Sequence, residues 1–488
     1  MIAQGLTVIG FALAICLQAA IAVEAPLPPN VLLVVADDMN NDLGAYGNTF
    51  VQTPNIDRLA QSGVVFTHAY AQYPQCNQSR ASFLTSRYPD QTGILSLKEH
   101  VRDTMPDVVT LPQHFRNHGY TTVRVGKVFH QGVPTEIGQP GLDDARSWDV
   151  TVNPIGVDKR VEDKVESIAP PELEWRRFGG TLSWLRLESE EKHTDQIGAD
   201  EAIRLMGDYH PDRTGKPLFL ALGFYRPHTP FVAPGRWYDA YPPEKVQLVE
   251  VPPGDRENKP IAALADRRFQ AEMTDQQKRQ AIQGYYASIS FVDEQLGKVL
   301  GALERHGLAD NTLIVFVSDH GYQLGSHGLW QKRDLFENST RAPLIMVAPG
   351  RLQAGLRSAA PVELLDIYPT LTALAGLPQP ETALQGMSLV EVVAGNEPSR
   401  EAALSQSWSA AHLVRPVRRG LQVMGYSIRT SRYRYTEWDG GQEGVELYDY
   451  SSDPLEYRNL AEDEAYLQVV RELKATLDNK LRSIHQSD

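Results

Sequence analysis

The chain has 488 residues, of which 42% are apolar and 22% are charged, as in ordinary globular proteins. This length allows one large domain with a substantial core and a smaller second domain. The formal net charge of −14 argues against a general nucleic-acid binder, which would present a basic face. It also weakly disfavours tight binding to a large polyanion, although a local basic pocket is compatible with it because nearby charges dominate the field inside a pocket.

The first 23 residues are predicted to be a secretory signal peptide. Residues 8–17 are mostly apolar, and Ala20, Ile21 and Ala22 give a small-x-small cleavage pattern. An uncleaved anchor is the alternative, because the segment has no Lys or Arg; a lipoprotein site at Cys16 is less favoured. No other run approaches the roughly 20 apolar residues that span a bilayer. We therefore expect a secreted or periplasmic protein with no membrane span in the mature chain.

Four short apolar runs predict strands that are buried on both faces of a sheet. They are residues 31–36, 218–222, 313–317 and 344–347. Helical patterns occur at residues 55–60, about 276–305 and 364–374, and Thr53 and Pro54 predict the start of the first, with Thr as its cap. This alternation predicts an α/β fold in which helices sandwich a large, mostly parallel mixed sheet.

The pattern of predicted strands and helices changes after about residue 376. Strand patterns at 426–430, 433–436 and 446–450 are followed by a helical pattern at 464–483, which predicts a smaller antiparallel α+β subdomain. Residues 134–180 and 233–275 are rich in Pro, Gly and charge and predict long surface loops. The predicted organisation is a signal peptide at 1–23, a catalytic domain at 24–375 and a C-terminal subdomain at 376–488.

Two of the predicted strands run into acidic residues. One is followed by Asp37 and Asp38, and the other by Asp319 and His320. Ligands of open α/β sheets bind beyond the carboxyl ends of strands. If the two strands are neighbours, three carboxylates meet there and would raise one another's pKa unless a cation neutralised them. Oxygen-rich clusters suit calcium or magnesium. The alternative is that each Asp only caps a turn, but two matched strand ends favour a metal site.

Cys76 is the only cysteine outside the predicted signal peptide. A single cysteine in an exported protein cannot form an internal disulfide. Cys76 therefore either packs as a buried apolar residue or has a role in the chemistry of the protein. Ser79 and Arg80 follow it, and residues 81–85 have a helix-like composition.

Residues 76–80, Cys-Asn-Gln-Ser-Arg, resemble the Cys-x-Pro-Ser-Arg signature of the sulfatase family, with Gln78 in place of Pro and Ser86 in place of a Gly in the following tail. Other motifs are similar to the iduronate-2-sulfatase branch of that family. They lie at residues 126–130, 226–230, 318–321, 324–328 and 332, and the tail at 448–460 is typical of the family's C-terminal subdomain. The resemblance implies an alkaline-phosphatase-like fold and a cysteine that a formylglycine-generating enzyme converts to formylglycine.

The same resemblance implies roles for individual residues. Calcium would be held by Asp37, Asp38, Asp319 and His320 together with residue 76. The formylglycine hydrate at 76 would attack sulfur, stabilised by Arg80. Lys127, His228 and Lys332 would contact the sulfate oxygens, and His228 or Lys332 would protonate the departing alcohol. His130 would take a proton from the second hydroxyl of the hydrate. Without the family pattern, His130 would be read as a structural histidine and the two lysines as solvated, and His327 is left undecided.

The sequence therefore predicts a calcium-dependent sulfatase that acts on a sulfated sugar, with exo attack at a chain end. One alternative is a phosphonate or phosphate diester hydrolase of the same superfamily. The other is a non-catalytic protein that binds sulfated glycans. Comparing aryl sulfates with aryl phosphonates tests the first alternative, and measuring sulfate release tests the second.

Overall fold

The computed structural model describes residues 28–170, 181–265, 269–395, 400–409 and 423–486. The predicted signal peptide, with Cys16, lies outside these residues. No helix within them has the length and apolar character needed to cross a membrane.

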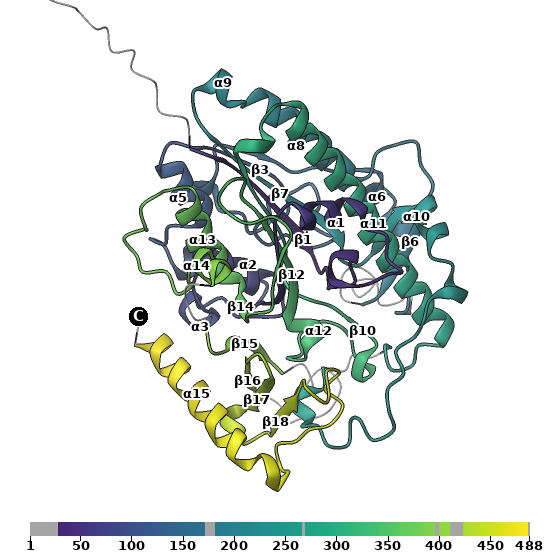
Figure 1. Ribbon diagram of the computed structural model, residues 1–488. Coiled ribbons are helices and arrows are strands. Elements are labelled where there is room, and N and C mark those ends of the chain that lie inside the picture. The colour runs from purple at the N-terminus through teal and green to yellow at the C-terminus, as the bar shows by residue number, and fades with distance from the viewer. Residues whose placement is uncertain (1–27, 171–180, 266–268, 396–399, 410–422, 487–488) are drawn as a thin grey trace, which may run out of the picture.

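Within the described residues the main sheet has nine strands, as Figure 1 shows in part. Their order is β13 (Leu356–Ser358), β2 (Val64–Tyr70), β12 (Arg341–Val347), β9 (Thr312–Ser318), β1 (Asn30–Asp37), β7 (Leu218–Pro227), β3 (Thr121–Gly126) and β4 (Val150–Val152), with β14 (Val362–Glu363) also paired to β2. From β9 to β4 all neighbours are parallel, whereas β12 runs antiparallel to both β9 and β2. The predicted mixed, mostly parallel sheet is confirmed, and the four predicted strands are β1, β7, β9 and β12.

Helices cover both faces of this sheet (Figure 1). One face packs against α1 (Pro54–Gln61), α8 (Thr194–Asp208) and α11 (Asp275–Arg305). The other packs against α2 (Cys76–Thr85), α5 (Leu111–Asn117), α13 (Ile367–Leu374) and α14 (Leu389–Ala394). Alternate residues of β1 serve the two faces: Leu32 and Val34 join the first core, and Leu33 and Val35 join the second. This explains why residues 31–36 of the strand are all apolar.

The first helix begins at Pro54, as predicted, but Thr53 does not cap it. The carboxylate of Asp293 on α11 accepts hydrogen bonds from the backbone N–H groups of Asn55 (3.0 Å) and Ile56 (2.7 Å) instead. The free N–H groups at this helix start are thus satisfied by a long-range partner, which local sequence could not indicate.

The C-terminal part forms a separate four-stranded antiparallel sheet covered by one helix (Figure 1). It contains β15 (Ala403–Trp408), β16 (Met424–Arg429), β17 (Tyr433–Trp438), β18 (Val445–Asp449) and α15 (Leu467–His485). Leu473, Leu477 and Ile484 of α15 are buried in its core. The predicted strands and helix are present, and β15 is an addition. The domain boundary at 376 stays a prediction.

The two regions predicted as long loops also hold short elements. These and the remaining short elements are α3 (Pro89–Thr92), α4 (Val101–Thr104), α6 (Val157–Arg160), β5 (Glu166–Ser167), β6 (Ser183–Leu187), α9 (Pro211–Thr214), β8 (Phe231–Pro234), α10 (Gly235–Ala240), β10 (Gln323–Leu324), β11 (Trp330–Gln331) and α12 (Glu337–Thr340).

Candidate active site

The two acidic strand ends lie side by side. In the register of β1 with β9, Ala36 is opposite Ser318, so the residues that follow each strand meet at one edge of the sheet. Asp37, Asp38 and Asp319 are fully buried there. Burial opposes the charged form of each carboxylate, but neighbouring lysine, arginine and histidine side chains outweigh it and hold the pKa of all three below the usual value. The predicted convergence of three carboxylates is therefore present.

A tight turn after β1 lets two consecutive aspartates face the same site. Asp38 has φ 67°, in the left-handed region that Asp tolerates better than most residues. Its N–H donates to Asp319 Oδ1 (3.1 Å), and its carbonyl accepts from Tyr285 Oη on α11 (2.8 Å). The same hydroxyl accepts from the N–H of Asn40 (2.8 Å). Tyr285 thus fixes the turn from the opposite layer of the fold.

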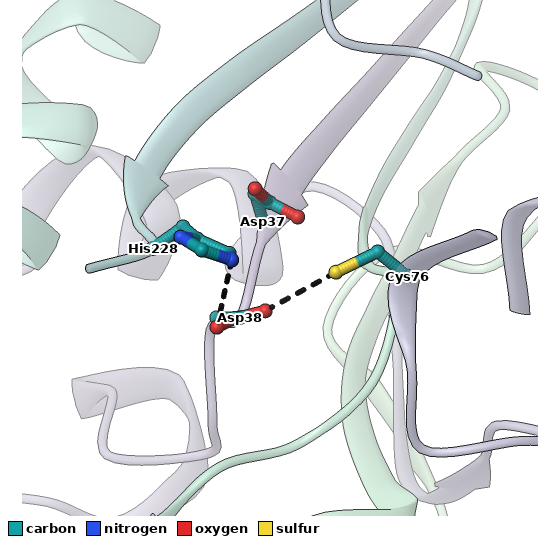
Figure 2. Close-up of side chains that lie close together, drawn as sticks. All are labelled: Asp37, Asp38, Cys76 and His228. Atoms are coloured by element: carbon teal, nitrogen blue, oxygen red, sulfur yellow. Dashed lines mark hydrogen bonds and ion pairs between the residues drawn. The ribbon is translucent and has the colours of Figure 1, made fainter. Parts of the chain in front are cut away.

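Cys76 is the first residue of α2 and points at these aspartates (Figure 2). Its Sγ lies 3.6 Å from Asp38 Oδ1 and 3.5 Å from His320 Nε2. Burial disfavours the thiolate, but Lys332 and then Lys127 favour it, and the pKa of Cys76 is lowered overall. The free N–H groups of a helix start also favour negative charge here. These surroundings favour an anionic group at position 76.

Arg80 lies one turn further along α2, and its guanidinium group contacts the site. Its Nε donates to Asp319 Oδ2 (2.9 Å), and its Nη2 donates to Asp37 Oδ1 (3.1 Å) and to the Ala36 carbonyl (3.4 Å). Its Nη1 donates to the carbonyls of Lys127 and Val128. These contacts fix the orientation of two carboxylates; a direct contact of Arg80 with the group at position 76 stays a prediction.

Two lysines reach the cluster from different segments. Lys127 Nζ donates to Asp37 Oδ2 (2.6 Å). Lys332, which follows β11, donates to Asp38 Oδ1 and lies 3.0 Å from Cys76 Sγ. Both lysines are buried. With Arg80 they balance the three carboxylates, so a divalent cation would leave the site attractive to an anion.

The hydrogen bonds of two histidines fix which ring nitrogen faces the cluster. Nδ1 of His320 lies 2.8 Å from the Gly321 carbonyl, and Nδ1 of His228 lies 2.5 Å from the Thr229 carbonyl. A carbonyl only accepts, so each Nδ1 carries its proton and each Nε2 points at Asp38, at 3.3 Å for His320 and 3.7 Å for His228. Metal-binding histidines are commonly oriented in this way.

His130 is the most isolated member of the set. It is buried, its Nδ1 has no hydrogen-bond partner among the described residues, and burial together with Lys127 lowers its pKa to about 3. The imidazole is therefore neutral at neutral pH, as a general base requires.

The donor set fits a hard divalent cation. Ligand atoms of Asp38, Cys76, Asp319 and His320 lie within 4.8 Å of one another, and so do those of Asp37, Asp38, Cys76 and His228. Asp38 Oδ2 is buried with no hydrogen-bond partner. Sγ of Cys76 occupies the place that an oxygen of a modified residue 76 would take. Three carboxylates with added oxygen ligands match the preferences of calcium.

His327, left undecided by the sequence, lies outside this cluster. Its Nδ1 is 3.2 Å from both Asp255 carboxylate oxygens, and its ring stacks on Phe336 with centroids 4.2 Å apart. These contacts anchor the loop that leads to Lys332.

The site thus combines buried carboxylates for a cation with fixed cations for an anion, around one nucleophile position. A family model described as Sulfatase matches residues 29–377. The chain belongs to the sulfatase family. A second model, the C-terminal domain of N-sulphoglucosamine sulphohydrolase, matches residues 325–483. The enzyme is a sulfatase.

The comparisons extend over nearly the whole chain. Mouse (Mus musculus) iduronate 2-sulfatase is 31% identical over 536 aligned residues, which cover 91% of this chain and 93% of that protein. The solved structure of a 2-O GAG sulfatase has a TM-score of 0.71 at 23% identity, covering 94% of this chain and 93% of the other. The phosphonate monoester hydrolase of Agrobacterium radiobacter has a TM-score of 0.72 at 24% identity, covering 94% and 96%. The last two likenesses show the shared fold.

Two features of the site were not predicted from the sequence. The first is that a ring nitrogen of His228 lies within 4.8 Å of ligand atoms of Asp37, Asp38 and Cys76, whereas the family motif implied only a contact with sulfate. The second is Tyr285, which supports the Asp38 turn. Tyr285 lies within a regular apolar helix pattern, and no local signal separates it from an ordinary core residue.

Proposed function

We propose that this sulfatase hydrolyses a sulfate ester on a sugar, with formylglycine at position 76 and one calcium ion. The observation that carries the proposal is the placement of Cys76 at the start of α2, against Asp38, His320 and Lys332. When bound, calcium and formylglycine would supply a Lewis acid and a hydrated aldehyde as the nucleophile.

Side chains of the protein would bind the sulfate and transfer the protons. Lys127 and Lys332 would move from their aspartates to the sulfate oxygens once a cation neutralises the carboxylates, because charge builds up on those oxygens in the transition state. His228 or Lys332 would donate a proton to the departing alcohol oxygen. His130, held neutral by burial and by Lys127, would accept a proton from the group at position 76. Arg80 would keep Asp37 and Asp319 in place throughout.

We propose exo attack on a terminal sulfated sugar. The named activity of the mouse relative supports a sulfated uronate as one candidate. The net charge of −14 supports a chain end over a long polyanion, because the surface would repel the polymer. Salt screens such repulsion. We therefore expect sulfated disaccharides to be better substrates than intact polysaccharide, with a gap that narrows as salt rises; sulfate loss from internal residues alone would contradict exo attack.

Maturation and location complete the proposal. A formylglycine-generating enzyme would modify Cys76 before folding buries it, and the signal peptide at 1–23 would direct the protein to the periplasm or outside the cell. Peptide mass spectrometry of active protein tests the modification. An active enzyme that keeps an unmodified Cys76 thiol would contradict it.

The fold resembles that of a phosphonate monoester hydrolase, so phosphonate esters are the alternative substrate class. Aryl sulfate and aryl phosphonate esters with the same leaving group separate the two. The proposal expects the higher kcat/KM with the sulfate, and a clear preference for the phosphonate would replace it.

A further inference from the structure

Arg333 follows Lys332 directly, is partly buried, and differs from the buried arginines of the protein. Each of Arg80, Arg226 and Arg434 forms an ion pair with a carboxylate. The side chain of Arg333 has no hydrogen bond and no ion pair with any described residue, and its Nε is buried without a partner. Cations in protein interiors are normally paired, and this partly buried guanidinium has no carboxylate partner among the described residues, so a ligand can supply its counter-ion.

The surroundings of Arg333 agree with this. Burial lowers its pKa, and the group that opposes this effect is the Tyr73 hydroxyl rather than a carboxylate. Tyr73 lies three residues before Cys76, and its hydroxyl accepts the N–H of Trp408 (2.8 Å). The carbonyl of Arg333 accepts from Ser407 Oγ (3.1 Å). Arg333 is therefore held between the segment that leads to position 76 and the end of β15.

The backbone fixes this placement. Gln331 has φ 73° and Arg333 has φ 89°, both in the left-handed region that costs energy for residues with a side chain. Between them, Lys332 reaches Cys76 Sγ at 3.0 Å. Gln331 is also held by Gln270, whose Nε2 donates to Gln331 Oε1 (2.7 Å). One strained tripeptide thus presents Lys332 to the reaction centre, and Arg333 is the next residue along the chain, near Tyr73.

We propose that Arg333 is a specificity residue that binds a second anionic group of the substrate, a carboxylate or a second sulfate next to the sulfate that is removed. This inference rests on the proposed function, because it assumes that a sulfated sugar enters the same site. A planar guanidinium suits both anions, since it can donate two parallel hydrogen bonds to either. The uncharged hydroxymethyl group of a neutral sugar would leave the guanidinium unpaired.

Three methyl glycosides test the proposal: a 2-sulfated hexuronate, the matching 2-sulfated hexose, and the 2,6-disulfated hexose. Their dissociation constants would be measured by calorimetry on calcium-loaded, full-length protein carrying Cys76→Ala, with and without Arg333→Gln. We expect at least one doubly anionic sugar to bind about ten-fold or more tightly than the singly sulfated hexose, as one charge-assisted hydrogen bond allows. Arg333→Gln should remove this preference, and Arg333→Lys should retain part of it. The matched control is Arg458→Gln, an exposed arginine, which should keep the full preference.

The pattern of loss identifies the anion. Loss of preference for the hexuronate alone assigns a carboxylate, and loss for the disulfated hexose alone assigns a second sulfate. An unchanged preference in Arg333→Gln, or no preference for either doubly anionic sugar in the parent protein, would overturn the proposal. Failure of the proposed function is a separate result: protein with formylglycine at position 76 would release no sulfate from any of the three sugars, whatever their binding.

Discussion

Lys332 Nζ lies 3.0 Å from Cys76 Sγ and also contacts Asp38, so one ammonium group touches both the nucleophile position and a predicted metal ligand. These three residues come from the end of β1, the start of α2 and the segment after β11. Their meeting point depends on the parallel pairing of β1 with β9 and on the turn at Asp38.

Loss of one carboxylate should weaken calcium binding. Asp38→Asn and Asp319→Asn are each expected to lower calcium affinity at least about ten-fold, since even changes behind the ligands at metal sites cost roughly 10–100-fold. Asp310→Asn is the matched control because Asp310 is exposed and precedes β9, at the opposite end of that strand from Asp319. Calorimetric titration of chelator-treated protein measures the affinity. Full activity in demonstrably metal-free protein would show that the carboxylates are structural only.

The Tyr285 hydroxyl should matter for both the fold and the metal. Tyr285→Phe leaves the N–H of Asn40 without its acceptor and releases the Asp38 carbonyl, at an expected cost of about 1–3 kcal/mol in the free energy of unfolding. Calcium affinity should fall as well, because the Asp38 turn loses its support. Tyr286→Phe is the control, since that neighbouring hydroxyl contacts Asp42 instead. Equal calcium affinities for the two variants would refute a positioning role.

His130 should make the protein sensitive to acid. Burial and Lys127 lower its folded pKa to about 3, against about 6.5 for an exposed histidine. Between these values the unfolded chain binds more protons than the folded protein, so stability rises with pH and is lost as pH falls below about 6.5. From pH 7 to pH 5 this one group accounts for a loss of about 2 kcal/mol.

His130→Asn should therefore reduce the acid-dependent loss of stability by that amount, and it should slow turnover by about 100-fold or more through loss of a general base. Urea unfolding at pH 7 and pH 5 measures the first effect. His118→Asn, which changes an exposed histidine, should retain the parent's pH dependence. An unchanged acid dependence in His130→Asn would mean that the histidine is not held neutral by burial.

Glu337 should be essential for joining the catalytic sheet to the C-terminal sheet. Its carboxylate accepts hydrogen bonds from Tyr70 on β2 (3.0 Å) and Arg434 on β17 (2.6 Å), and arginines hold its pKa below the usual value despite burial. Glu337→Gln should cost about 3–5 kcal/mol, because it leaves a buried arginine without its counter-charge. Thermal unfolding checks this, with the exposed Glu401→Gln as control. A loss below about 1 kcal/mol would show that the pair does not hold the two sheets together.

Much of the site was predictable because its residues follow strongly apolar strands. The runs before Asp37 and Asp319 are uninterrupted, so the strand ends followed from the pattern. Their meeting at one edge required that the two strands be neighbours, as the pairing of β1 with β9 shows they are. β3 was missed for a physical reason: Arg124 interrupts it, and this charge is tolerated inside the sheet because its Nε lies 2.8 Å from an Asp143 carboxylate oxygen. A long-range ion pair of this kind leaves no local signal.

Other parts of the site could not be predicted from local sequence. The family motif implied that Arg80 acts on the group at position 76. Its hydrogen bonds go to two carboxylates and to carbonyls that converge only in the folded chain. In the sequence, nothing distinguishes Arg333 from an ordinary surface arginine. Its proposed role comes only from the absence of a partner for its Nε in the folded surroundings that the structure describes.

The most direct test of the account is the release of inorganic sulfate from sulfated mono- and disaccharides by calcium-loaded protein whose residue 76 carries an aldehyde, measured by ion chromatography beside the Cys76→Ala variant. The account predicts one sulfate released for each desulfated sugar formed, and a rate lower by at least about a thousand-fold in the variant, as expected when a nucleophile is removed. Equal rates in the two proteins, or no sulfate from any sugar by the modified protein, would contradict it.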